Sequence, residues 1–154
     1  MEWAALITWV LTAGAGFVLL ATWLSRGGMR QGSGPRGQIR PPLILGHFGL
    51  AATGLVIWII YLATDSDALA WIAFVVLAIV AVLGWTMFAI WLRRRQARAA
   101  VAAGGAGGAA ASSPAGGDVP AEQHFPVPVV ALHGVLAVTT VVLVFLTAIG
   151  VGGS

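Results

Sequence analysis

Apolar residues fill four long stretches of the chain, and polar residues gather in the segments between them. The stretches lie near 3–25, 42–64, 68–92 and 127–150, and each has the roughly 20 residues that a helix needs to cross a bilayer. A segment rich in alanine, glycine, serine and proline at 99–120 predicts a flexible linker, whose alanine-rich start can extend the third helix. The pattern predicts an all-α fold: an integral-membrane, up-down four-helix bundle forming one domain over 1–154.

Composition narrows the chemistry that the chain can support. Of its 154 residues, 59% are hydrophobic and 8% are charged, which is too little polar surface for a soluble domain of this size. The chain has no cysteine, so disulfides, thiolate zinc sites, iron–sulfur clusters and covalent c-type haem are all excluded. The first apolar stretch follows Glu2 rather than basic residues, so we expect a retained helix and not a signal peptide.

All eight cationic residues are arginines, and they lie in two groups. The groups are Arg26, Arg30, Arg36 and Arg40 before the second stretch, and Arg93, Arg94, Arg95 and Arg98 after the third. The link between the second and third stretches carries Asp65 and Asp67 instead. The positive-inside rule predicts a multi-pass protein of the bacterial inner membrane with both arginine segments in the cytoplasm and both termini outside. Arginines in this position meet lipid headgroups, so the basic charge does not indicate nucleic-acid binding.

The chain contains an internal repeat. Residues 42–53 align without a gap on residues 128–139 and share the pattern P-x4-H-x2-L-A-x-T, which places His47 and His133 at equivalent positions. Residues 16–26 align on residues 84–94, which pairs Gly16 with Gly84 and gives both segments the same Trp-Leu-x-Arg ending. The alignment predicts an internally duplicated two-helix repeat, whose halves share one orientation and are related by a pseudo-twofold axis along the membrane normal.

The two histidines are candidate ligands of one metal. Each lies five residues after a proline that starts its helix, so both side chains lie roughly 8 Å inside the bundle. The second and fourth helices run parallel and lie diagonally across an up-down bundle, so the imidazoles of His47 and His133 share a level. A flat macrocycle between them would receive one nitrogen from each side, as a haem does.

Other residues fit the same hypothesis. Gly16 and Gly84 lie at a similar depth on the other two helices and would leave room for the macrocycle. Arg26, Arg40 and Arg94 lie at the nearest aqueous face and could pair with haem propionates.

These features resemble the four-helix cytochrome b module of quinol-oxidising complexes and, less closely, the b561-type membrane cytochromes. The resemblance implies axial ligation by His47 and His133, with Gly16 and Gly84 making room for haem b. It implies electron transfer, with a quinone as a candidate partner and a respiratory complex as a candidate setting. Members often hold a second haem through histidines fourteen residues further along, where this chain has Tyr61 and Thr147. We therefore expect one haem, on the cytoplasmic side.

Several alternatives stay open. The histidine pair could form only hydrogen bonds across the bundle, bind another metal or relay protons, and His124 could replace His133 as a ligand. The chain could also be a cofactor-free accessory subunit of a larger membrane complex, or a homo-oligomer. The sequence identifies no catalytic residues, so it leaves open whether the protein is an enzyme.

The seven tryptophans lead to a separate prediction about packing. Trp3, Trp23, Trp71 and Trp91 lie near the ends of the apolar stretches and are expected to be interfacial anchors. Trp58 and Trp85 lie deeper in their stretches, and we expect them to fill the core.

Overall fold

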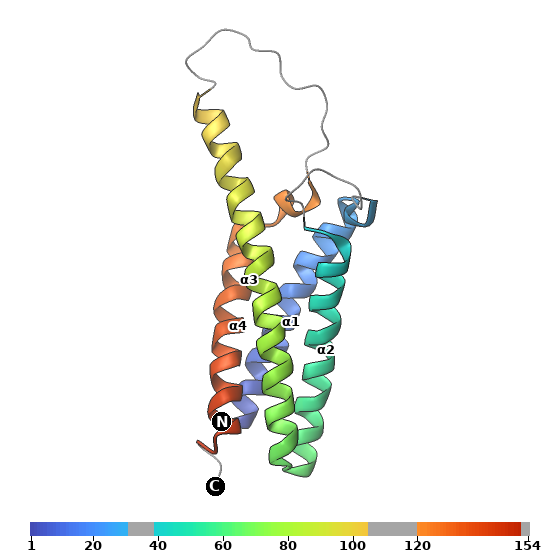
Figure 1. The fold of residues 1–154 in the computed structure, drawn as a ribbon, viewed down its shortest axis with the longest axis vertical. Helices are drawn as coiled ribbons and strands as arrows, with labels where there is room; N and C mark the ends of the chain where they lie inside the picture. Colours follow the sequence, from blue (N-terminus) through green and yellow to red (C-terminus); the bar gives the residue numbers. More distant parts are fainter. Residues whose placement is uncertain (31–38, 105–119, 152–154) are drawn as a thin grey trace.

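The computed structural model describes residues 1–30, 39–104 and 120–151, and it is a bundle of four long helices (Figure 1). The helices are α1 (Glu2–Ser25), α2 (Pro41–Thr64), α3 (Asp67–Gly104) and α4 (Val127–Ala148), with 3₁₀ turns η1 (Gly28–Arg30) and η3 (Ala121–His124). Neighbouring helices run in opposite directions, and the N-terminus lies beside the end of α4. Each helix is long and apolar enough to cross a membrane. The all-α, four-helix membrane fold is thus confirmed, and the chain is a multi-pass membrane protein.

Local sequence sets where the helices begin and end. Pro41 and Pro128 lie in the first turns of α2 and α4, where the missing N–H of proline costs no hydrogen bond. Asp65 ends α2 in the left-handed conformation with φ of 50°, and the chain then turns directly into α3. Asp67 lies in the first turn of α3, where a negative charge is favourable.

The third helix extends beyond the predicted apolar stretch, which ended near residue 92. It continues to Gly104, so the alanine-rich start of the predicted linker is helical, as its composition allowed. Residues 105–119 of the predicted linker lie outside the described residues, and Pro120 leads into η3.

The described arginines lie at one end of the bundle and three of the four described carboxylates lie at the other; the fourth, Glu122, lies in η3. We call the end where α1 finishes and α2 begins the arginine end; it carries η1, η3 and Arg26, Arg30, Arg40, Arg93, Arg94, Arg95 and Arg98. The opposite end, the acidic end, carries Glu2, Asp65 and Asp67. Arg36 lies outside the described residues.

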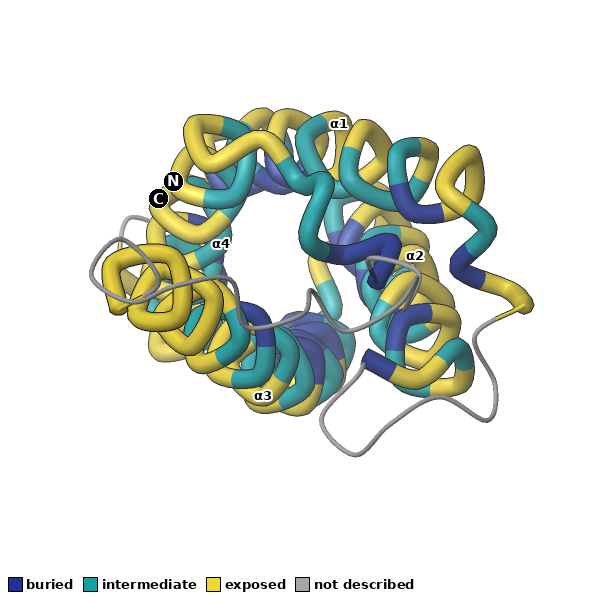
Figure 2. Tube along the Cα trace, turned by 90° about the horizontal axis from the view of Figure 1, so that it is seen from above, coloured by how far each residue is buried: buried dark blue, intermediate teal, exposed yellow. Residues whose placement is uncertain are grey.

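The helices associate as two close pairs. Helix α1 lies along α4 and α2 lies along α3, whereas α1 and α2 touch over a shorter length. Seen along the bundle, the outer faces are exposed and the buried residues face inward (Figure 2). Because the exposed outer faces are largely apolar, they suit contact with lipid.

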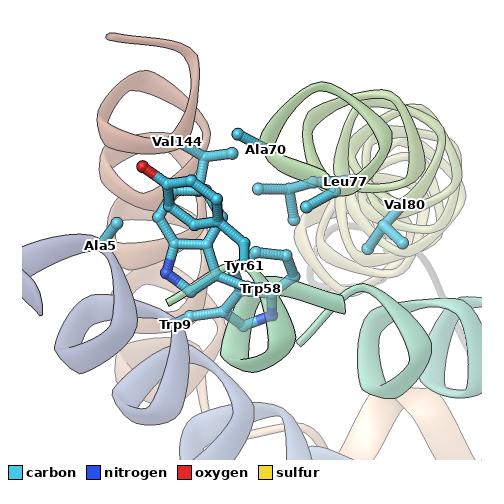
Figure 3. Close-up of a cluster of buried hydrophobic side chains, with 9 residues drawn as sticks. Ala5, Trp9, Trp58, Tyr61, Ala70, Leu77, Val80 and Val144 are labelled. Atoms are coloured by element: carbon cyan, nitrogen blue, oxygen red, sulfur yellow. The ribbon is translucent and has the colours of Figure 1, made fainter. Parts of the chain in front are cut away.

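The interior contains two separate apolar clusters. The larger, the acidic-half core, is built around Trp58, whose ring lies beside the rings of Trp9 and Tyr61 (Figure 3). The smaller, the arginine-end core, contains Trp23, Ile39, Ile44, Trp91 and Ala121. Through Ala121, the short turn η3 packs into the arginine end of the bundle.

The tryptophans are distributed differently from the prediction. Trp3 and Trp71 are exposed near helix ends, as anchors would be. Trp23 and Trp91 are instead buried in the arginine-end core, because η3 and the residues before α2 cover them. Trp85 is 62% exposed on the outer face of α3, so it does not fill the core as Trp58 does.

Candidate functional site

The structure brings His47 of α2 and His133 of α4 together in the bundle. Their ring centroids lie 6.3 Å apart, and the ring planes are inclined by 60°. Both residues are half-buried. The two imidazoles therefore lie close together inside the bundle.

Each imidazole is held by a backbone carbonyl of a neighbouring helix. Nδ1 of His47 lies 3.1 Å from the carbonyl oxygen of Val80, and Nδ1 of His133 lies 3.0 Å from that of Thr12. Because a carbonyl oxygen only accepts, Nδ1–H is the donor in both bonds, and Nε2 keeps its lone pair. No hydrogen bond to either Nε2 is seen among the described residues. Metal-binding histidines are commonly oriented in this way.

The two predicted glycines contact the two histidines directly. A methyl group at Gly16 would lie 3.0 Å from Cε1 of His133, and one at Gly84 would lie 3.2 Å from Cε1 of His47. We expected these glycines to leave room for a macrocycle. In the structure, the group that approaches each glycine is the imidazole from the other repeat.

The repeat makes the site interlocked. The α1–α2 half supplies Gly16 and the Thr12 carbonyl for His133, and the α3–α4 half supplies Gly84 and the Val80 carbonyl for His47. In each half the carbonyl lies four residues before the glycine, so both face the same side of the helix. Neither half contains a complete histidine environment by itself.

The separation of the rings suits one metal ion between them. A metal–nitrogen bond is about 2.0 Å long, and the ring centre lies about 1.1 Å beyond the nitrogen, so two imidazoles on opposite sides of one ion have centroids about 6 Å apart. The observed 6.3 Å matches this value. Within the described residues, no group of three or more histidine, cysteine, aspartate or glutamate side chains forms a metal site. Two protein ligands suit a haem, whose own macrocycle supplies the other donors.

The histidines lie in a layer of the bundle that contains no fully buried residue. We call this the histidine layer: residues 13–22 of α1, 45–53 of α2, 81–90 of α3 and 127–139 of α4. None of these residues is fully buried, although buried residues occur on both sides of the layer. The layer is about 15 Å deep along the first three helices, which is enough for a macrocycle standing parallel to them.

The three predicted arginine partners lie beyond this layer at the arginine end. Arg26 and Arg40 are exposed, and Arg94 is half-buried. Arg40 lies about 10 Å along α2 from His47, and Arg26 lies about 15 Å along α1 from Gly16. Anionic groups at the edge of a ligand in the histidine layer would point toward this cationic end.

The rival ligand His124 is not paired with His47. It lies in η3, and its buried Nδ1 has no hydrogen-bond partner among the described residues. The ring that approaches His47 is that of His133.

Sequence reasoning missed the residues that orient the histidines. Thr12 and Val80 accept through main-chain oxygens, and the Thr12 hydroxyl also lies 3.3 Å from the hydroxyl of Thr140. Their side chains do not reveal this role, because the histidines contact the backbone carbonyl oxygens. The sequence feature that could have indicated it is their common position four residues before the aligned glycines.

Comparison with protein-family models, curated proteins and solved structures finds no match for this chain. The paired histidines and their surroundings are therefore the basis for a functional proposal.

Proposed function

We propose that this protein is a membrane-embedded b-type cytochrome that carries single electrons through one haem held by Nε2 of His47 and Nε2 of His133. The observation that carries this proposal is the 6.3 Å separation of two imidazoles whose Nδ1 atoms are already bonded to carbonyls. That arrangement leaves an unprotonated Nε2 on each of two neighbouring rings. The two histidine donors and the length of the histidine layer along the helices both fit a haem.

The bound haem would supply one-electron chemistry, and the chain would supply position and environment. The carbonyls of Val80 and Thr12 fix the tautomer and the orientation of the two imidazoles. Gly16 and Gly84 allow the rings to approach the helices closely. Arg26, Arg40 and Arg94 are the proposed partners of the propionates, and the apolar clusters on both sides keep water out.

The rest of the proposal concerns orientation and stoichiometry. We propose that the protein lies in a bacterial inner membrane with the arginine end in the cytoplasm and both termini outside, an orientation that the positive-inside bias supports. We propose one haem because the positions of a second ligand pair are occupied by Tyr61, which stacks on Trp58, and Thr147, whose hydroxyl donates to the Leu143 carbonyl. A quinone or a larger respiratory complex is the proposed redox partner.

The second candidate is a cofactor-free accessory subunit of a larger membrane complex. Its support is that the same hydrogen bonds join α2 to α3 and α4 to α1. Under this hypothesis, the histidines serve only to hold the helix pairs together.

Absorption spectroscopy of the purified protein separates the two candidates. The protein should be produced with a haem supply, purified in detergent and measured as a reduced-minus-oxidised difference spectrum. A sharp b-type α band with one haem per chain is expected, lost in His47→Ala and in His133→Ala and retained in His124→Ala. A folded wild-type protein that takes up no haem would support the accessory subunit and contradict the cytochrome. Full haem binding in both of the first two variants would reject the ligand assignment.

A further inference from the structure

One fully buried carboxyl group lies in the wall of the arginine end. Glu122 of η3 has no exposed surface, although side chains of this type are rarely buried without a partner. Its Oε1 accepts a hydrogen bond of 3.4 Å from the backbone N–H of Ile39, just before the start of α2. Its Oε2 has no hydrogen-bond partner among the described residues. One oxygen of this carboxyl group is therefore available to hold a proton.

The carboxyl group lies close to the histidine layer. Its neighbour Ala121 belongs to the arginine-end core together with Ile44, and Val130 packs against the same cluster. Ile44 and Val130 each lie three residues, or about one helical turn, before His47 and His133. The separation between the carboxyl group and the histidine pair is thus on the order of 10 Å, across apolar side chains.

The charged groups around Glu122 are mostly cationic. The elements at the arginine end contribute Arg26 after α1, Arg30 of η1, Arg40 before α2 and Arg94 of α3. Its own turn contributes His124. A change of one charge at the histidine layer would change the electrostatic potential at this carboxyl group.

We propose that Glu122 takes up the proton that accompanies one-electron reduction of the histidine-bound haem; this rests on the proposed function. A bound haem would supply the one-electron chemistry, with a reduced quinone or protein carrier as the electron donor, and one proton would pass from the aqueous phase at the arginine end to Oε2 of Glu122. Oxidation returns the electron to an acceptor and the proton to water. The net charge of the protein interior is therefore the same in the reduced and in the oxidised state.

The size of the effect follows from the separation. Two unit charges about 10 Å apart, in a medium of effective dielectric constant about 20, change a protonation equilibrium by a factor on the order of ten. At high pH the carboxylate keeps its negative charge and opposes the added electron. The midpoint potential should therefore fall as pH rises. The total fall is about 59 mV, which is the change in a one-electron potential that corresponds to a tenfold change in the protonation equilibrium.

Potentiometric titration of the haem-loaded protein from pH 5 to pH 9 tests this proposal. The wild-type potential should fall by about 59 mV across this range, and that of Glu122→Gln should not change. Glutamine keeps an acceptor for the Ile39 N–H. Glu2→Gln is the matched control, because Glu2 also accepts a hydrogen bond, from the Tyr61 hydroxyl, but lies at the acidic end. This control should retain the wild-type pH dependence.

Infrared difference spectroscopy gives a second readout if Glu122→Gln loads haem poorly. The chain has only two glutamates, Glu2 and Glu122, so ¹³C-glutamate labelling restricts the shifted carboxyl bands to these two side chains. A labelled band for a protonated carboxyl should appear on reduction in Glu2→Gln. A pH-independent potential in loaded wild-type protein, or an unchanged dependence in Glu122→Gln, would overturn this inference alone. A protein without haem would overturn the proposed function and this inference with it.

Discussion

The contact between Gly16 and His133 gives the sharpest mutational prediction. A methyl group at position 16 would lie 3.0 Å from Cε1 and 3.3 Å from Nδ1 of His133. Carbon atoms in contact prefer about 3.5–4.0 Å, so Gly16→Ala must move the imidazole by about 0.5 Å or more. That movement stretches the 3.0 Å bond from Nδ1 to the Thr12 carbonyl.

The energetic cost can be set from this geometry. Forcing one methyl group into a packed interior costs about 1–3 kcal/mol. If this cost falls on the ligand-binding state, haem affinity in Gly16→Ala should drop about tenfold to a hundredfold. Gly84→Ala should show a smaller loss, because its methyl group would lie 3.2 Å from Cε1 and 3.8 Å from Nδ1 of His47.

Gly14→Ala is the matched control for this experiment. Gly14 lies two residues earlier in α1, and a methyl group there would meet nothing within 4 Å. Both substitutions gain the same helix propensity, so their difference isolates the contact with the imidazole. Haem titration of the apoprotein in detergent measures the affinities. Equal affinities for Gly14→Ala and Gly16→Ala would refute the claim that this glycine seats the histidine.

Further predictions concern the fold and its orientation. Trp58→Ala should destabilise the bundle by about 3–5 kcal/mol because Trp58 is fully buried, whereas Trp85→Ala on the outer face should cost less than about 1 kcal/mol. Thermal unfolding in detergent compares the two variants, and equal losses of stability would contradict the packing. Tyr61→Phe removes the 2.8 Å hydrogen bond to Glu2 and should lower the free energy of unfolding by about 0.5–1.5 kcal/mol without changing the haem content. A drop in haem content would contradict the independence of the histidine layer from the acidic-half core. Because the chain has no cysteine, the single-cysteine variants Ser66→Cys and Ser25→Cys report the membrane topology. In intact cells, a membrane-impermeant maleimide should label position 66 and not position 25. The reverse labelling pattern would contradict the proposed orientation.

The sequence was sufficient to predict the fold because the code for membrane helices is mostly one of composition. Long apolar runs must form helices in lipid, since every backbone polar group needs an internal partner there. The spans predicted near 42–64 and 127–150 agree closely with α2 and α4. The end of α3 was less predictable, because alanine-rich chain leaving a membrane can be linker or helix, and here it stays helical to Gly104.

The site was predictable in its members but not in its contacts. The repeat pointed to His47, His133, Gly16 and Gly84, and the structure brings these four together. Which glycine contacts which histidine depends on which helices pair, and nothing in the sequences of α1 and α4 indicates that these two helices pair. The burial of Trp23 and Glu122 was likewise hidden, because it requires η3 to fold over the arginine end.

We propose that Nε2 of His47 and Nε2 of His133 would both hold the iron of one haem. Electron paramagnetic resonance of the oxidised protein, with ¹⁵N-histidine labelling, measures this directly. The expected result is a low-spin ferric signal with hyperfine coupling to two histidine nitrogens, which is lost in His47→Ala and in His133→Ala. A high-spin signal, coupling to one histidine nitrogen only, or a haem signal that survives both substitutions would contradict it.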